Sequence, residues 1–94
     1  MASDWRFEYS ELLTKELKKL KKRDPRRFDI LMKKRDDIKE KLLLNQDHFK
    51  NLSHELSDFR RVHIDKHFVL IFKVDKQNKV IRFEDYDHHD KIYD

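Results

Sequence analysis

The sequence predicts a two-layer α+β domain, in which an N-terminal strand and a two-helix hairpin accompany an antiparallel sheet of about four strands. Two observations lead to this expectation. In the last third of the chain, apolar and polar residues alternate in short stretches rich in Val, Ile and Phe, which is typical of strands. In the first half, leucines recur at helical spacing. The 94 residues are enough for one domain, spanning residues 1–94, with one modest core.

The first half of the chain predicts one strand and two helices. The stretch Trp5–Tyr9 alternates aromatic and charged residues and is expected to form the opening strand. Ser10 suits the N-cap of a first helix over Glu11–Arg23, in which Leu13, Leu17 and Leu20 fall at helical spacing. Asp24 then caps a second helix over Pro25–Leu44, because proline is disfavoured inside a helix but fits its first turn.

The second half predicts three further strands, over Phe59–Ile64, Phe68–Val74 and Val80–Glu84. The residues Asp65 and Lys66 are enough for a tight hairpin, and Asp75–Asn78 supplies side chains that favour turns. The three strands should therefore form an antiparallel meander with one face buried and one face free for polar side chains. The segment Asp85–Tyr93 is expected to follow as a histidine-rich tail.

The composition narrows the function classes. The net charge of +4 and the isoelectric point near 9.3 favour a polyanionic partner such as nucleic acid. The chain has no cysteine, which fits a cytosolic protein, and no apolar run long enough for a membrane span or a signal peptide. It also has no glycine, which excludes the glycine-rich phosphate loops of common ATP and dinucleotide sites. We expect a cytoplasmic protein with no cofactor and no membrane partner.

Histidines are the main chemical signal, since five of the six lie between His54 and His89. An imidazole can both take and give a proton near neutral pH. Cleavage of RNA by its own 2′-hydroxyl needs a base, an acid for the departing 5′-oxygen, and cations that stabilise the charge on phosphorus. The side chains expected on the free face can supply these functions without a metal: Arg60, Arg61, His63, His67, Arg82 and His89. The alternative is a set of exposed histidines on a polar sheet.

The order of the elements, with the stretches Phe59–Lys73 and His89–Tyr93, resembles the RelE/ParE superfamily of toxins from toxin–antitoxin systems. Within that superfamily the likeness is to the YafQ-type branch, which the opening Phe7–Ser10 also suits. The resemblance implies a RelE-like fold and a ribosome-dependent endoribonuclease, or mRNA interferase. Its partners would be mRNA, the ribosome and a cognate antitoxin that keeps it inactive.

The resemblance also implies site residues. The family has a histidine in the loop before the second strand, which matches His54, and another near the end of that strand, which matches His63. Its C-terminal histidine and closing aromatic residue match His89 and Tyr93. We expect His89 to form the acid–base pair with His63 or with His67, while His54 assists.

The chain departs from the family pattern at the start of the third strand. The family's Asp-Trp pair falls on His67 and Phe68, so the acidic residue is replaced. The arginine that the RelE branch carries in this strand is also missing, with Val69 at the nearest position. The identity of the general base therefore stays open, and Phe68 or Tyr93 is expected to stack on an RNA base. Phe68 could instead belong to the core. The resemblance also gives Tyr93 a catalytic alternative, since a tyrosine near the end of RelE-type sequences helps position or activate the 2′-hydroxyl.

Basic residues are the candidate phosphate contacts. Alternation along the second strand places Arg61 on the side of His63 and Arg60 on the other, which favours Arg61 as the residue that stabilises the phosphate. Arg82 is a further candidate on the sheet. In the first helix, Lys18 and Lys22 belong to a basic run that either contacts RNA or forms a solvated helix face.

Three other functions fit parts of the sequence. A ParE-like toxin that inhibits gyrase would keep the fold without needing acid–base residues, and a non-catalytic homologue would only bind nucleic acid. The tail could also hold a divalent metal through Asp85, Asp87, His88, His89 and Asp90. We expect no metal, because the sequence shows no second set of residues that would support such ligands.

Overall fold

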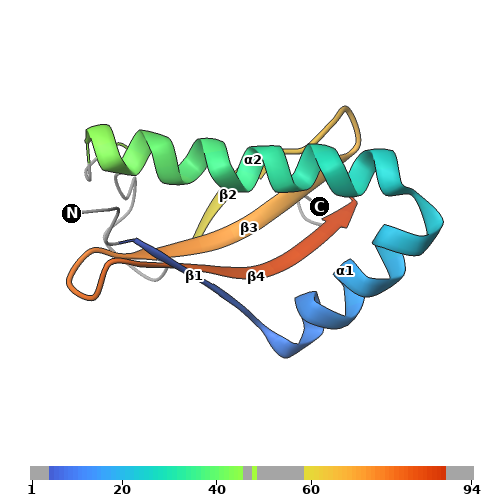
Figure 1. The fold of residues 1–94 in the computed structure, drawn as a ribbon, viewed down its shortest axis with the longest axis horizontal. Helices are drawn as coiled ribbons and strands as arrows, with labels where there is room; N and C mark the ends of the chain where they lie inside the picture. The colour runs from blue at the N-terminus through green and yellow to red at the C-terminus, as the bar shows by residue number, and fades with distance from the viewer. Residues whose placement is uncertain (1–4, 46–47, 49–58, 89–94) are drawn as a thin grey trace.

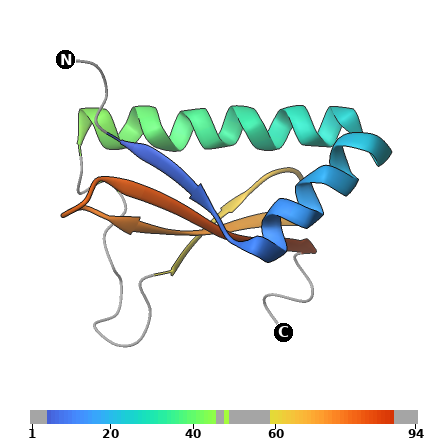
Figure 2. The same ribbon diagram turned by 60° about the horizontal axis from the view of Figure 1, so that its bottom comes forward.

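The computed structural model of the protein describes residues 5–45, 48 and 59–88, which form two helices and four strands (Figure 1). In chain order these are β1 Arg6–Tyr9, α1 Glu11–Arg23, α2 Pro25–Leu44, β2 Phe59–His63, β3 Phe68–Asp75 and β4 Val80–His88. The strands form one sheet in the order β1-β4-β3-β2. Helix α2 lies across one face of this sheet, and α1 packs beside β4 (Figure 2). The two-layer α+β class predicted from the sequence is confirmed.

Both helices begin at the capping residues that the sequence indicates. The Ser10 hydroxyl accepts a hydrogen bond from the N–H of Leu13 at 3.0 Å, and the Asp24 carboxylate accepts one from the N–H of Arg27 at 3.0 Å. Each bond satisfies a backbone donor that a helix leaves unpaired at its start. Asp24 also ends α1, because its own N–H donates to the carbonyl of Leu20 at 2.8 Å. One residue therefore separates the helices, and their predicted bounds are confirmed.

The sheet is mixed and not wholly antiparallel. Strands β2, β3 and β4 form the predicted antiparallel meander, but β1 pairs with β4 in parallel, with Arg6 opposite Val80 and Tyr9 opposite Phe83. A parallel pair needs a long connection between its strands, which the helices and the other strands provide. The expectation of an antiparallel sheet is wrong for β1, because local alternation does not reveal which strand will lie beside it.

Strand β4 is longer than predicted. Residues Asp85–His88, which we expected in a tail, continue β4 and pair with the first half of β3. The register shifts at Glu84, which is the additional residue of a β-bulge. Because the bulge interrupts the alternation, Phe83 and Tyr86 both lie in the core although they are three residues apart. Because the alternation is interrupted at the bulge, the prediction from the sequence ended the strand too early.

The hairpin between β2 and β3 also differs from the prediction. Residues 64–67 connect the strands, in place of a two-residue turn at Asp65 and Lys66. The N–H of Ile64 donates to the carbonyl of Phe68 at 2.9 Å, and the Asp65 carboxylate accepts the N–H of His67 at 2.9 Å. The loop is therefore closed by a side-chain-to-backbone hydrogen bond of the kind that aspartate makes in turns.

The core lies between the helices and the sheet. Its buried members are Trp5, Leu13, Leu20, Leu31, Ile38, Leu42, Ile64, Leu70, Phe72, Ile81, Phe83 and Tyr86. The helical members lie on the faces that the leucine and isoleucine spacing predicts. Neither helix in the described part of the chain combines the length and the apolar character that a membrane crossing requires.

Candidate functional site

The strand register divides the sheet into a helix-facing side and a side away from the helices, here called the open side. Val69, next to the core residue Leu70, points to this side and is nevertheless 0% exposed, so the side is not bare along its whole length. Phe72 and Phe83 lie opposite each other and belong to the core. Their neighbours Lys73 and Arg82 also lie opposite each other, and they point to the open side because side chains alternate along a strand. On β1 the same alternation places Glu8, which lies opposite Arg82, on the open side.

Alternation along β2 assigns its two arginines to different sides of the sheet, although Arg60, on this edge strand, also lines the basic pocket described below. Val62 packs against the core, so its neighbours Arg61 and His63 lie on the open side, and both are exposed. Arg60 lies opposite the core residue Phe72 and is only partly exposed. Arg61 and His63 therefore share a face, as the alternation indicates.

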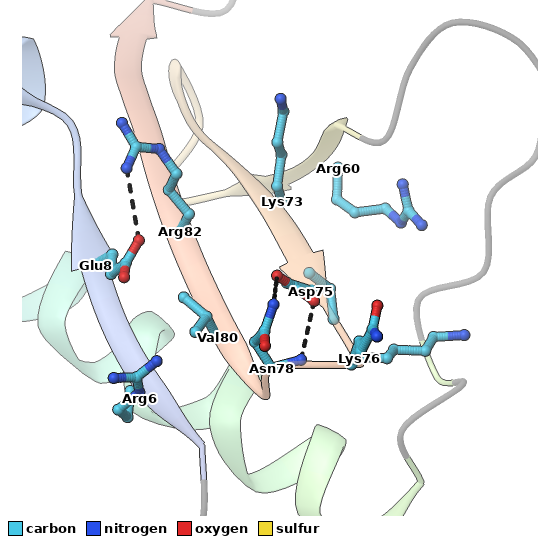
Figure 3. Close-up of a pocket in the computed structure, with 11 residues that line it drawn as sticks. Arg6, Glu8, Arg60, Lys73, Asp75, Lys76, Asn78, Val80 and Arg82 are labelled. Atoms are coloured by element: carbon cyan, nitrogen blue, oxygen red, sulfur yellow. Dashed lines mark hydrogen bonds and ion pairs between the residues drawn. The ribbon is translucent and has the colours of Figure 1, made fainter.

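A pocket of about 690 Å³ opens beside the turn between β3 and β4 (Figure 3). Its lining carries five basic and two acidic residues. These are Arg6, Arg60, Lys73, Lys76 and Arg82 with Glu8 and Asp75. The Asp75 carboxylate is occupied within the turn, where it accepts hydrogen bonds from the backbone N–H and the side chain of Asn78 at 3.0 and 2.9 Å. The excess of positive charge favours an anionic ligand such as a phosphodiester.

The cations of this pocket are held in place by their neighbours. The guanidinium of Arg82 lies 3.5 Å from the Glu8 carboxylate and 2.9 Å from that of Glu84. Since the Arg82 side chain is 45% exposed, these ion pairs contribute little free energy, and an incoming anion can compete with them. The ammonium of Lys73 lies 4.5 Å from the centroid of the Phe59 ring. One cation of the pocket thus lies over an exposed aromatic ring.

Three of the described histidines lie at the other end of the sheet. His63 is the last residue of β2, His67 directly precedes β3, and His88 is the last residue of β4. The rings of His67 and His88 are stacked, with centroids 5.8 Å apart and planes inclined by 11°. His88 lies opposite Phe68, which packs against the core, whereas His63 is on the open side. The structure therefore brings His67 to His88 and places His63 on the other face of the same sheet end.

An ion pair ties the hairpin before β3 to the first turn of α2. The Nε of Arg27 donates to Oδ2 of Asp65 at 2.9 Å, and the N–H of His67 donates to Oδ1 of the same carboxylate at 2.9 Å. The Arg27 guanidinium lies 4.1 Å from the centroid of the Phe68 ring, which stacks on Tyr86 at 5.2 Å. Helix α2 thus holds both His67 and Phe68 through one arginine.

These contacts shift the pKa values of the groups that make them. Burial raises the pKa of the Asp65 carboxyl, but hydrogen bonds from His67 and Arg27 outweigh it, so the net pKa lies below its ordinary value. Burial lowers the pKa of Arg27, but hydrogen bonds with Asp65 and Tyr86 raise it overall. The pKa of Tyr86 is raised, mainly by burial. At neutral pH the site therefore holds an ionised Arg27–Asp65 pair beside a neutral phenol.

Other predicted site residues lie elsewhere. His54, His89 and Tyr93 are outside the described residues, and their roles stay predictions. Lys18 and Lys22 are exposed on α1, in the helical layer and away from the open side of the sheet. Lys18 borders an apolar pocket of about 270 Å³ where α1, α2 and β1 meet. The structure does not bring these two lysines to the histidines.

Sequence reasoning considered His88 only as a metal ligand in the tail and missed its place on β4 beside His67, and it missed the Arg27–Asp65 pair. A signal for His88 existed, because Tyr86 resumes the apolar pattern after the bulge and extends the strand. No local pattern signals the ion pair, whose members are 38 residues apart in the chain. Phe68, predicted as a base-stacking residue, already has the Arg27 guanidinium over its ring.

The arrangement is suited to acid–base chemistry on an anionic substrate. Imidazoles transfer protons near neutral pH, and the basic pocket attracts phosphate. Within residues 5–45, 48 and 59–88, no group of three or more His, Cys, Asp or Glu side chains is placed to hold a metal ion. The predicted metal alternative in the tail also includes His89 and Asp90, which lie outside these residues.

The fold and the site define a small α+β protein with a basic open face and histidines at one sheet end. No protein-family model matches the chain. Its fold is similar to that of YafQ in the crystal structure of the Escherichia coli DinJ–YafQ toxin–antitoxin complex, with a TM-score of 0.58 and 24% identity. The match covers 97% of this chain and 99% of YafQ. The architecture is therefore that of a YafQ-like toxin fold.

Two archaeal relatives are more similar in sequence. The protein named "Putative toxin RelE4" of Methanocaldococcus jannaschii is 48% identical over 89 residues, which cover 95% of this chain and 90% of the relative. An uncharacterized protein of Methanosarcina mazei is 45% identical over 84 residues, which cover 89% of this chain and 92% of the relative. The chain belongs to the RelE family of toxins of toxin–antitoxin systems.

Proposed function

We propose that the protein is a ribosome-dependent endoribonuclease that cleaves translated mRNA, and that a cognate antitoxin holds it inactive. The observation that carries the proposal is the gathering of imidazoles at one end of a sheet whose open side bears a basic pocket. Proton transfer and phosphate binding are the two functions that cleavage by the 2′-hydroxyl of RNA requires. Membership of the RelE toxin family supports the same reaction class.

The open side offers a path for the RNA backbone. Lys73 and Arg82 lie at the pocket, and His63 lies opposite Val69, four residues along β3 from Lys73. This separation corresponds to roughly 13 Å. Arg61 lies between them on the same side, so positive charge runs from the pocket towards the histidines. A single strand laid along this side would place a phosphodiester near His63, whereas His67 and His88 lie on the other face of the same sheet end.

The histidines supply the proton transfers without a metal. His63, His67 and His88 lie within the described residues, and the predicted His54 and His89 would add to this set. One imidazole takes the proton of the attacking hydroxyl, and another protonates the leaving 5′-oxygen. Cations near the histidines offset the negative charge that builds on the phosphate.

The nuclease activity is controlled by an antitoxin that covers the site. YafQ, which shares the fold, was crystallised in complex with the antitoxin DinJ. We extend that arrangement to this chain, with a cognate antitoxin as its partner. A basic pocket favours an acidic antitoxin segment, which would compete with RNA for the same side chains.

The test is the integrity of mRNA in a translating extract with the purified protein. Wild type should cleave the message, while His63→Ala and His67→Ala should each slow cleavage about 100-fold. His48→Ala is the matched control, because His48 is exposed and lies outside the sheet and both helices. Intact message with wild type would overturn the proposal. Stalled DNA replication in cells that express the protein would then favour a gyrase-directed toxin.

A further inference from the structure

His67, which stands where the family has an acidic residue, has a neighbour that the sequence did not reveal. The ring of His67 stacks on that of His88 at 5.8 Å, with the planes inclined by 11°. His67 belongs to the hairpin before β3, and His88 is the last residue of β4. Two side chains that can both carry protons are thus held together, 21 residues apart in the chain.

The ring of His88 is held by the aromatic residues beneath it. The edge of the Phe68 ring meets the His88 ring at 5.1 Å and 71°. Phe68 in turn stacks on Tyr86 and lies beneath the Arg27 guanidinium. His88 is therefore half-buried at a defined position, and its ring does not sample solvent freely.

His67 is held from its backbone. Its N–H donates to Asp65, whose other carboxylate oxygen accepts the Nε–H of Arg27. The ring itself is exposed, so its nitrogen atoms can reach a substrate. One imidazole is thus fixed by ring packing and the other by the hairpin, which is the preorganisation that proton transfer in a transition state needs.

The surroundings leave room for a phosphate beside His67, the exposed member of this pair. A pocket of about 330 Å³ opens next to His67, between the hairpin and the first turn of α2, and Arg26 and Lys66 line it. Asp24 and Asp65 also line this pocket, but both carboxylates face Arg27, at 3.5 and 2.9 Å. The exposed Arg26 and Lys66 therefore remain to attract an anion.

We propose that His67 and His88 are the acid–base pair of the reaction, so that an imidazole pair replaces the carboxylate that the family pattern has at His67. This inference rests on the proposed ribonuclease function. One imidazole takes the proton of the 2′-hydroxyl while that oxygen attacks phosphorus. The bond from phosphorus to the 5′-oxygen breaks, and the other imidazole gives its proton to that oxygen.

The products are a 2′,3′-cyclic phosphate and a free 5′-hydroxyl. After the reaction the base is protonated and the acid is neutral, and exchange with water restores both for the next cycle. Arg26 and Lys66 bind the phosphate that undergoes attack. Arg27 and Asp65 are positioning residues, because they act on the substrate only through His67 and Phe68.

The test compares two synthetic mRNAs on programmed ribosomes, one ordinary and one with a 5′-bridging sulfur at the cleavage position. A thiolate leaves without protonation, so loss of the general acid matters little for the sulfur substrate. We expect His67→Ala and His88→Ala each to slow cleavage of ordinary RNA about 100-fold or more. One of the two variants, the one that lacks the acid, should cleave the sulfur substrate at nearly the wild-type rate.

A second variant separates chemistry from folding. His88→Phe keeps a ring against Phe68 but cannot transfer a proton, so it should unfold at the wild-type temperature and still be inactive on ordinary RNA. His48→Ala should cleave both substrates like wild type. Two results would overturn the assignment of the acid–base pair. One is a cleavage rate of His88→Ala within about threefold of wild type, and the other is that neither variant regains its cleavage rate on the sulfur substrate. If the wild-type protein cleaves neither RNA, the proposed function itself fails, and the pair fails with it.

Discussion

Replacement of Asp65 by asparagine isolates the contact that joins α2 to the hairpin. The carboxylate uses one oxygen for the Arg27 Nε–H and the other for the backbone N–H of His67, each at 2.9 Å. Asparagine has the same shape but only one acceptor oxygen. The amide oxygen of asparagine can still accept the hydrogen bond from the His67 N–H. The amide NH2 group then faces the Arg27 guanidinium, and no hydrogen bond forms there because both groups are donors.

The size of the stability loss expected for Asp65→Asn follows from how far the Arg27–Asp65 pair is buried. A hydrogen bond to a charged group contributes about 1.5–3 kcal/mol when buried, and an exposed ion pair about 0.2–1 kcal/mol. The Arg27 and Asp65 side chains are 29% and 27% exposed, which places the pair between these limits. We expect Asp65→Asn to lower the free energy of unfolding by about 1–2 kcal/mol at neutral pH. For a domain of this size that loss lowers the melting temperature by roughly 4–16 °C.

The stability loss caused by Asp65→Asn should depend on pH and should shrink as the pH falls. The folded pKa of Asp65 is lowered, so its contribution is present above the ordinary carboxyl pKa of about 4 and disappears as pH falls through the folded pKa. Thermal unfolding followed by circular dichroism should therefore separate wild type from Asp65→Asn at about pH 7 and bring them together at about pH 2.

Asp36→Asn is the matched control for this prediction. Asp36 also pairs with an arginine at 2.9 Å, but its side chain is 63% exposed. We expect its replacement to change the free energy of unfolding by less than about 0.5 kcal/mol. Equal effects of the two substitutions, or an Asp65→Asn effect that does not depend on pH, would refute the reasoning.

Three further predictions concern the cap, the core and the bulge. Ser10→Ala removes both the cap of α1 and the hydroxyl that donates to the Glu84 carbonyl at 2.6 Å, so urea unfolding should show a loss of about 1–3 kcal/mol, and Ser10→Thr should recover most of it. Leu31→Ala should cost about 2–5 kcal/mol in the same assay because Leu31 is 1% exposed, whereas Leu44→Ala, at a position 84% exposed, should change little. Burial and the nearby Asp87 and Glu16 raise the folded pKa of Asp85, so its ionisation destabilises the fold as pH rises. Asp85→Asn should therefore raise the melting temperature at about pH 7 and not at about pH 3, and a lower melting temperature at about pH 7 would contradict this account.

Local chemistry accounts for what could be predicted from the sequence. Ser10 and Asp24 bond to N–H groups three residues ahead, so the helix starts were readable in the sequence. The period-two pattern of the strands was equally local, and it placed Arg61 and His63 on one side of β2. The prediction of β4 stopped at Glu84 because the bulge there breaks the alternation on which it relied.

The sequence alone thus determined the order and bounds of the helices, the meander, the helix-facing residues and the basic, histidine-rich character of the surface. The tertiary structure decided the parallel pairing of β1 with β4, the Arg27–Asp65 tie and the stacking of His67 on His88. These contacts join residues that are far apart in the chain. Their partners are chosen by how the layers pack together, and this information is absent from any local pattern of residues.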